Sequence, residues 1–103
     1  MKKATPKPQT VNILGLTYEI ERSSSNDTYG HIDFEKQKIT IDKNITDDHA
    51  KLTLLHEIVH GILYGASFSK EGDDETLVQA IANGLFGIIK DNPRLLTEPL
   101  AVA

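Results

Sequence analysis

The sequence predicts an α+β fold, in which a small antiparallel sheet packs on two main helices. Segments that alternate apolar and polar residues come first in the chain, and segments with apolar residues at helical spacing follow Thr46. A chain of 103 residues can build one core but leaves no room for a second. We therefore expect one domain at residues 10–92, between a flexible N-terminal arm at 1–9 and a C-terminal tail at 93–103.

Three strand segments are expected, at about residues 11–21, 28–35 and 38–42. Apolar and polar residues alternate in each of them, as in a strand with one buried face. The first segment contains Gly15, so it is either bent there or divided into two short strands. The short polar link between the last two segments can turn the chain, and these two should form a hairpin.

Two helices are expected, at about residues 47–64 and 73–90. Thr46 is a suitable N-cap for the first, because its hydroxyl can accept a hydrogen bond from the first turn. Gly65 marks the expected end of this helix. The second helix should end before Pro93, because the residue that precedes a proline disfavours helical backbone.

Composition excludes several classes of protein. The formal net charge is −4 and basic residues do not cluster, so nothing supports a nucleic-acid partner. No apolar stretch is long enough to span a bilayer, and no signal peptide is visible at the N-terminus. The chain has no cysteine, which fits a reducing compartment. We expect a cytoplasmic protein without a membrane partner, in which histidines and carboxylates would hold any metal; the sequence does not indicate the oligomeric state.

The pentad His56-Glu57-Ile58-Val59-His60 is the most informative motif in the chain. Histidines four residues apart share one face of a helix and lie about 6 Å apart along its axis, so both can reach one metal ion. Glu57 can then accept a proton from a water molecule at that ion. The alternative is a helix with two solvent-facing or capping histidines. The apolar residues around the pentad argue against it, because polar groups near a core need partners.

A catalytic zinc site needs a third protein ligand. The metzincin pattern requires glycine and histidine where this chain has Leu63 and Ala66, so that class is excluded. A carboxylate from the following helix is the other common solution. Glu75 is favoured because Val78 and Ala82 continue from it at helical spacing. The other available carboxylates are those of Glu71, Asp73 and Asp74. Alternatively, these acids only complement a helix N-terminus.

Three further polar residues could support such a site. His31 lies on an expected strand and could steady an oxyanion, although a plain surface position is the simpler interpretation. Tyr64 lies one turn beyond the second histidine of the pentad and could donate to a substrate carbonyl, or could simply close the helix end. Gln79 shares the helix face of the expected carboxylate ligand. His49 lies about 10 Å along the helix from the pentad, too far to bind the same ion.

Two segments together resemble a known family. The pentad His56-Glu57-Ile58-Val59-His60 is followed by Glu75-Thr76-Leu77-Val78-Gln79-Ala80-Ile81-Ala82-Asn83-Gly84-Leu85. This order resembles the ImmA/IrrE-type metallopeptidases, in which an H-E-x-x-H helix precedes a helix of the form E-x-x-A-x-x-F-A-x-x-L-L. The similarity covers roughly residues 28–90 and is most specific at the pentad.

The resemblance implies a minimal zincin-like domain with Glu75 as third ligand of a Zn²⁺ ion. Members of that family are intracellular and common in phages and mobile elements, and some cleave a transcriptional repressor. The resulting hypothesis is a zinc metallo-endopeptidase with Glu57 as general base and a protein as substrate. The alternative is a zinc-stabilised, non-catalytic protein-binding module such as an adaptor, inhibitor or antirepressor. Glu57 argues against this alternative, because a purely structural metal site needs no carboxylate there.

Overall fold

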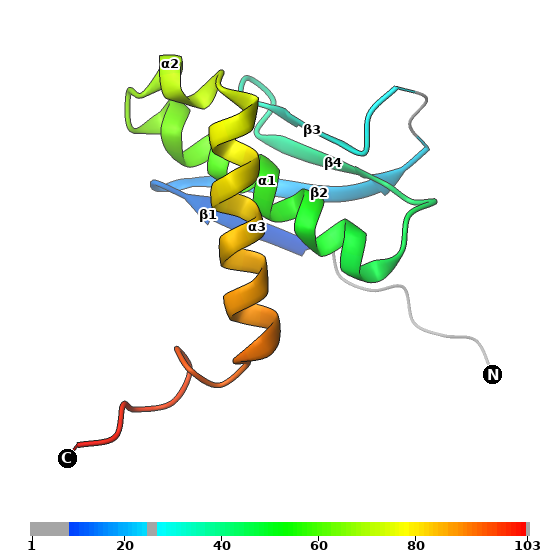
Figure 1. Ribbon diagram of the computed structural model, residues 1–103. Helices are drawn as coiled ribbons and strands as arrows, with labels where there is room; N and C mark the ends of the chain where they lie inside the picture. The colour runs from blue at the N-terminus through cyan, green and yellow to red at the C-terminus, as the bar shows by residue number, and fades with distance from the viewer. Residues whose placement is uncertain (1–8, 25–26, 103) are drawn as a thin grey trace.

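The computed structural model describes residues 9–24 and 27–102 and confirms the α+β class (Figure 1). Four strands come first in the chain and three helices follow. The elements are β1 (Gln9–Ile13), β2 (Leu16–Ser23), β3 (Gly30–Asp33), β4 (Lys38–Asp42), α1 (Asp47–Gly65), α2 (Ser69–Gly72) and α3 (Glu75–Asp91).

The sheet has the strand order β1-β2-β4-β3 and is mixed, so the expectation of an antiparallel sheet is wrong at its centre. The β1–β2 and β3–β4 pairs are antiparallel hairpins, whereas β2 and β4 run parallel, from Glu19 opposite Lys38 to Ser23 opposite Asp42. After β2 the chain continues to the edge strand β3 and then returns as β4, which lies between β2 and β3. Parallel and antiparallel strands share the same two-residue alternation, so the sequence pattern does not distinguish them.

The expected segment at 11–21 divides at the turn Leu14-Gly15, where both residues have positive φ angles of 48° and 86°. Glycine reaches such angles without steric cost, which permits the tight turn between β1 and β2. β1 already begins at Gln9, whereas the rest of the expected N-terminal arm, residues 1–8, lies outside the described residues. Residues 93–102 are exposed and contain no helix or strand.

The caps of the two long helices explain where each begins. The Thr46 hydroxyl accepts a hydrogen bond from the His49 amide at 3.2 Å, so the expected N-cap of α1 is confirmed. The Asp74 carboxylate accepts one from the Leu77 amide at 3.0 Å and starts α3 at Glu75, two residues later than expected. The short helix α2 was not predicted.

One core lies between the sheet and α1, which crosses one face of the sheet (Figure 1). Its buried residues are Ile13, Tyr18, Ile32, Ile39, Ile41 and Ala50. Two glycines permit α1 to lie close to the sheet. A Cβ on Gly61 would meet the Cδ1 atoms of Ile13 and Ile32 at 3.0 and 3.1 Å. A Cβ on Gly30 would lie 2.5 Å from Cγ2 of Thr53, so only glycine lets β3 lie this close to α1.

A second, smaller core joins α1 to α3 and consists of Val59, Val78 and Ala82. α3 packs on the side of α1 that faces away from the sheet, and its C-terminal half extends beyond the rest of the domain (Figure 1). Val78 and Ala82 are its buried residues. Among the helices described, none combines the length and the apolar character that crossing a membrane requires.

Candidate metal centre

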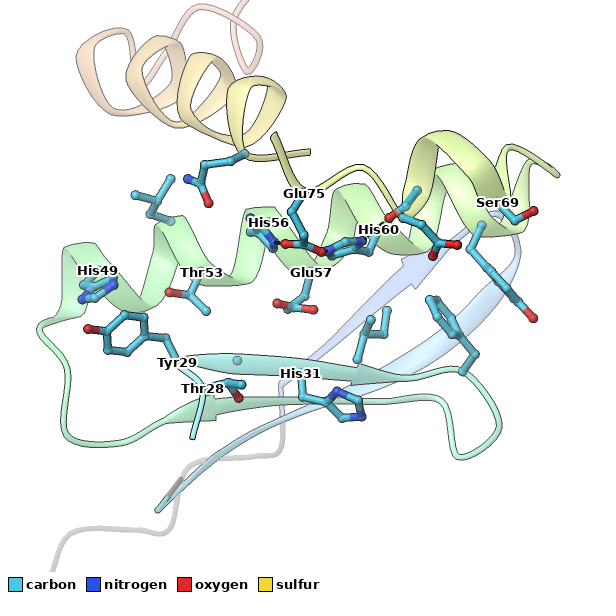
Figure 2. Close-up of a pocket in the computed structure, with 18 residues that line it drawn as sticks. Thr28, Tyr29, His31, His49, Thr53, His56, Glu57, His60, Ser69 and Glu75 are labelled. Atoms are coloured by element: carbon cyan, nitrogen blue, oxygen red, sulfur yellow. Dashed lines mark hydrogen bonds and ion pairs between the residues drawn. The ribbon is translucent and has the colours of Figure 1, made fainter. Parts of the chain in front are cut away.

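His56, His60 and Glu75 converge on one point above α1 (Figure 2). The Glu75 carboxylate spans both rings, with Oε2 at 3.0 Å from Nε2 of His56 and Oε1 at 2.9 Å from Nε2 of His60. The two Nε2 atoms are 3.1 Å apart. Within the described part of the chain, these three residues form the group whose ligand atoms could hold a metal ion.

Helical spacing and packing bring the three together. The histidines are one turn apart on α1, so their rings share a face. Glu75 is the first residue of α3, and the packing of Val78 and Ala82 against Val59 fixes the start of that helix over α1. The acid favoured from the sequence is thus the one that reaches the histidines.

His60 is held by a partner on α2. Its Nδ1 lies 2.7 Å from the carbonyl oxygen of Gly72. A carbonyl can only accept, so Nδ1 carries a proton, and in the neutral form of this ring the lone pair lies on Nε2. This tautomer presents Nε2 to a metal, and such a hydrogen bond is the usual support of a metal-binding histidine. The donor set therefore fits a metal ion on its chemistry as well as on its distances.

Glu57 lies beside this cluster and is buried, with only 7% of its surface exposed. Burial raises its pKa from 4.5 to about 7, because desolvation penalises the charged carboxylate. A charge on His60 opposes this rise in pKa, and the charge of Glu75 adds to it. Glu57 can therefore exchange a proton near neutral pH.

A cavity of about 590 Å³ opens between α1 and β3 beside the cluster. His56, Glu57, His60 and Glu75 line it, together with residues of β3 and α2 (Figure 2). None of the described residues that line it is a lysine or arginine. The cavity thus gives a bound molecule access to the candidate metal ligands and the buried carboxyl group.

The three supporting residues expected from the sequence all line this cavity, but in different settings. His31 is exposed on β3. The ring of Tyr64 stacks on that of Phe34, with centroids 4.1 Å apart and an interplanar angle of 16°. The amide nitrogen of Gln79 donates to Oδ1 of Asn83 at 2.7 Å rather than to a metal-ligand candidate.

The other acids considered as ligands take different positions. Asp73 lines the cavity but is not part of the ligand cluster, Asp74 caps α3, and Glu71 lies in α2. His49 is likewise outside the cluster and packs edge-on against Tyr29, with ring centroids 4.4 Å apart. Sequence reasoning missed the Gly72 carbonyl, because a backbone acceptor in an unpredicted helix leaves no side-chain signal.

Comparison of the chain with family models, with curated proteins and with solved structures finds no match.

Proposed function

We propose that this protein is a zinc-dependent peptidase that cuts an intracellular protein substrate. The observation that carries the proposal is the convergence of His56, His60 and Glu75 beside the buried Glu57, all on one cavity. The resemblance of the pentad and the following helix to ImmA/IrrE-type metallopeptidases adds the substrate class, a protein such as a transcriptional repressor.

Zinc suits this donor set. Two imidazole nitrogens and one carboxylate oxygen are a common ligand set of catalytic zinc, which keeps a further position open. A zinc ion bound by the three residues would polarise the scissile carbonyl and lower the pKa of a water molecule. Gly72 would keep the His60 ring in the orientation and tautomer that this ligand set needs.

Glu57 is the proposed general base. In the metal-free protein its pKa is about 7, near the pH at which an intracellular enzyme works, and a zinc ion bound nearby would lower this pKa and favour the carboxylate that accepts a proton. In the proposed reaction, its carboxylate takes a proton from the attacking water and then delivers it to the amine that leaves when the peptide C–N bond breaks. Burial keeps the group away from bulk solvent during this exchange.

The edge strand β3 is the proposed holder of the substrate backbone. It lies at one edge of the sheet, paired with β4 alone, and contributes residues to the cavity wall. An extended substrate segment can add to such an edge through main-chain hydrogen bonds. His31 and Tyr64, which line the cavity at different points of its wall, are candidates to donate to a substrate carbonyl oxygen.

The test compares the wild-type chain with Glu57→Gln and with the matched control Glu71→Gln, each loaded with zinc. A proteome-derived peptide library serves as substrate, and its products are read by mass spectrometry. We expect wild type and Glu71→Gln to cut. Glu57→Gln should retain zinc but cut at least about 100-fold more slowly, which is the low end of the rate enhancement that one acid–base group supplies.

Two results would contradict the proposal. If Glu57→Gln cuts as fast as wild type, Glu57 is not the base. If the wild-type chain binds one zinc and leaves every peptide intact, the peptidase assignment fails and a zinc-stabilised binding module replaces it.

A further inference from the structure

The cavity has an aromatic pair at each of its two ends. At one end Tyr29, just before β3, packs edge-on against His49 in the first turn of α1, with ring centroids 4.4 Å apart and an interplanar angle of 60° (Figure 2). At the other end Phe34, just after β3, stacks on Tyr64 in the last turn of α1. Each pair joins the edge of the sheet to the helix, and all four rings line the cavity.

The metal centre lies between these pairs. A helix rises 1.5 Å per residue, so His49 and Tyr64 are about 22 Å apart along α1. By the same measure, the point midway between His56 and His60 is about 13 Å from His49 and about 9 Å from Tyr64. An extended peptide advances about 3.3 Å per residue, so these distances correspond to roughly four and roughly three residues.

The two pairs remain available to a ligand. Tyr29 is 58% exposed and Tyr64 is 54% exposed, so their mutual contacts leave much of each ring uncovered. The wall between the pairs carries the polar side chains of His31, Thr53 and Glu57 together with the apolar Ile32 and Leu52. Aromatic rings at each end, which can pack against apolar side chains, and polar groups between them match an extended segment whose backbone is cut in the middle and whose side chains anchor both sides.

We infer that the cavity selects extended polypeptide segments with two bulky apolar side chains, one on each side of the cut bond and about six to seven residues apart. One side chain occupies the Tyr29–His49 end and the other the Phe34–Tyr64 end. The inference rests on the proposed function for the position of the cut, but the pattern of binding can be measured without turnover.

The probe is a library of random 12-residue peptides, selected for binding to the zinc-loaded Glu57→Gln variant. The same selection is repeated with Tyr29→Ala and Tyr64→Ala added separately to that background. The matched control is Phe68→Ala, because Phe68 is also 54% exposed but does not line the cavity. Thermal unfolding and zinc content are measured for each variant, and Tyr64→Leu, which keeps apolar bulk, is a second variant in case Tyr64→Ala does not fold.

We expect enriched apolar residues at two positions six or seven apart. Tyr29→Ala should remove the enrichment at one position and Tyr64→Ala at the other, whereas Phe68→Ala and Tyr64→Leu should retain both. The affinity for the best peptide should fall at least about 10-fold with each alanine, because losing even one methylene group from an apolar pocket costs about 10–200-fold.

Enrichment at neither or only one position would overturn the inference, as would two positions that survive both tyrosine substitutions. The selected peptides are then offered to the wild-type chain. If they bind with the two-position pattern but stay uncut, the peptidase proposal fails, whereas the inference that the cavity selects such segments stands. If the wild-type chain cuts peptides without that pattern, the peptidase proposal stands and the inference about its specificity fails.

Discussion

Replacing Glu57 with glutamine should change how the stability of the metal-free protein depends on pH. The folded protein holds this carboxyl group at a pKa of about 7, against 4.5 for an ordinary glutamate, chiefly because the group is buried. Each tenfold change in proton affinity corresponds to about 1.4 kcal/mol, so keeping the group charged in the folded state costs about 3 kcal/mol. Glutamine has nearly the same shape and cannot ionise.

The sign of the effect follows from which state binds more protons. Below pH 4.5 Glu57 is protonated in both states, and its environment costs no stability. Between pH 4.5 and 7 the unfolded chain loses this proton while the folded protein keeps it, so stability falls as the pH rises through that window. Above pH 7 both states are ionised and the loss is complete.

Urea unfolding of the wild-type chain and Glu57→Gln, both treated with a chelator, measures this difference. The stability of the variant relative to wild type should increase by about 2.5 kcal/mol between pH 5 and pH 8. Other titrating groups are common to both proteins and cancel in the comparison, apart from the smaller electrostatic effects of Glu57 on His60 and Glu75. A relative stability that stays constant across this range, or that falls, would refute the reasoning from burial.

Two further predictions concern the ligands and the close approach of β3 to α1. Glu75→Ala should weaken zinc binding by more than about 100-fold, because loss of a ligand's supporting partner alone costs about 10–100-fold, whereas Glu71→Ala should leave zinc binding unchanged. Elemental analysis and competition with a chelating dye measure the zinc content and affinity. Equal zinc binding in both variants would exclude Glu75 as a ligand. Gly30→Ala should cost about 1–3 kcal/mol in urea unfolding, because the new Cβ would lie 2.5 Å from Cγ2 of Thr53. Adding Thr53→Ser removes that methyl group and should restore part of the loss; an unchanged stability of Gly30→Ala would contradict the observed packing.

Local sequence signals were sufficient to predict most of the strands and helices. The Thr46 cap and the apolar spacing that follows it locate α1 closely. The alternation before Thr46 locates the strands, and Gly15 marks the division of the first segment. These features depend on interactions between residues near one another in the chain, which is why a single sequence reveals them.

Features that depend on distant residues were not predictable in the same way. The parallel pairing of β2 with β4 depends on the path between them, and strand alternation is the same for either direction. α2 has only four residues, too few for a helical period to appear in the sequence. Within the candidate site, the i, i+4 spacing of the histidines was visible and helical spacing favoured Glu75, but it is the packing of α3 on α1 that brings Glu75 rather than a neighbouring acid to the histidines.

The small number of buried residues in α3 has a consequence for the motions of the protein. With Val78 and Ala82 as its buried residues, α3 can open locally at a lower free energy than global unfolding requires. Since Glu75 begins this helix, an opening that separates it from α1 would also break a metal site shared with His56 and His60. Zinc at 100 times its Kd would then raise the cost of opening by about 2.7 kcal/mol. Amide hydrogen exchange in α3 would slow about 100-fold, which makes this helix a direct reporter of metal occupancy.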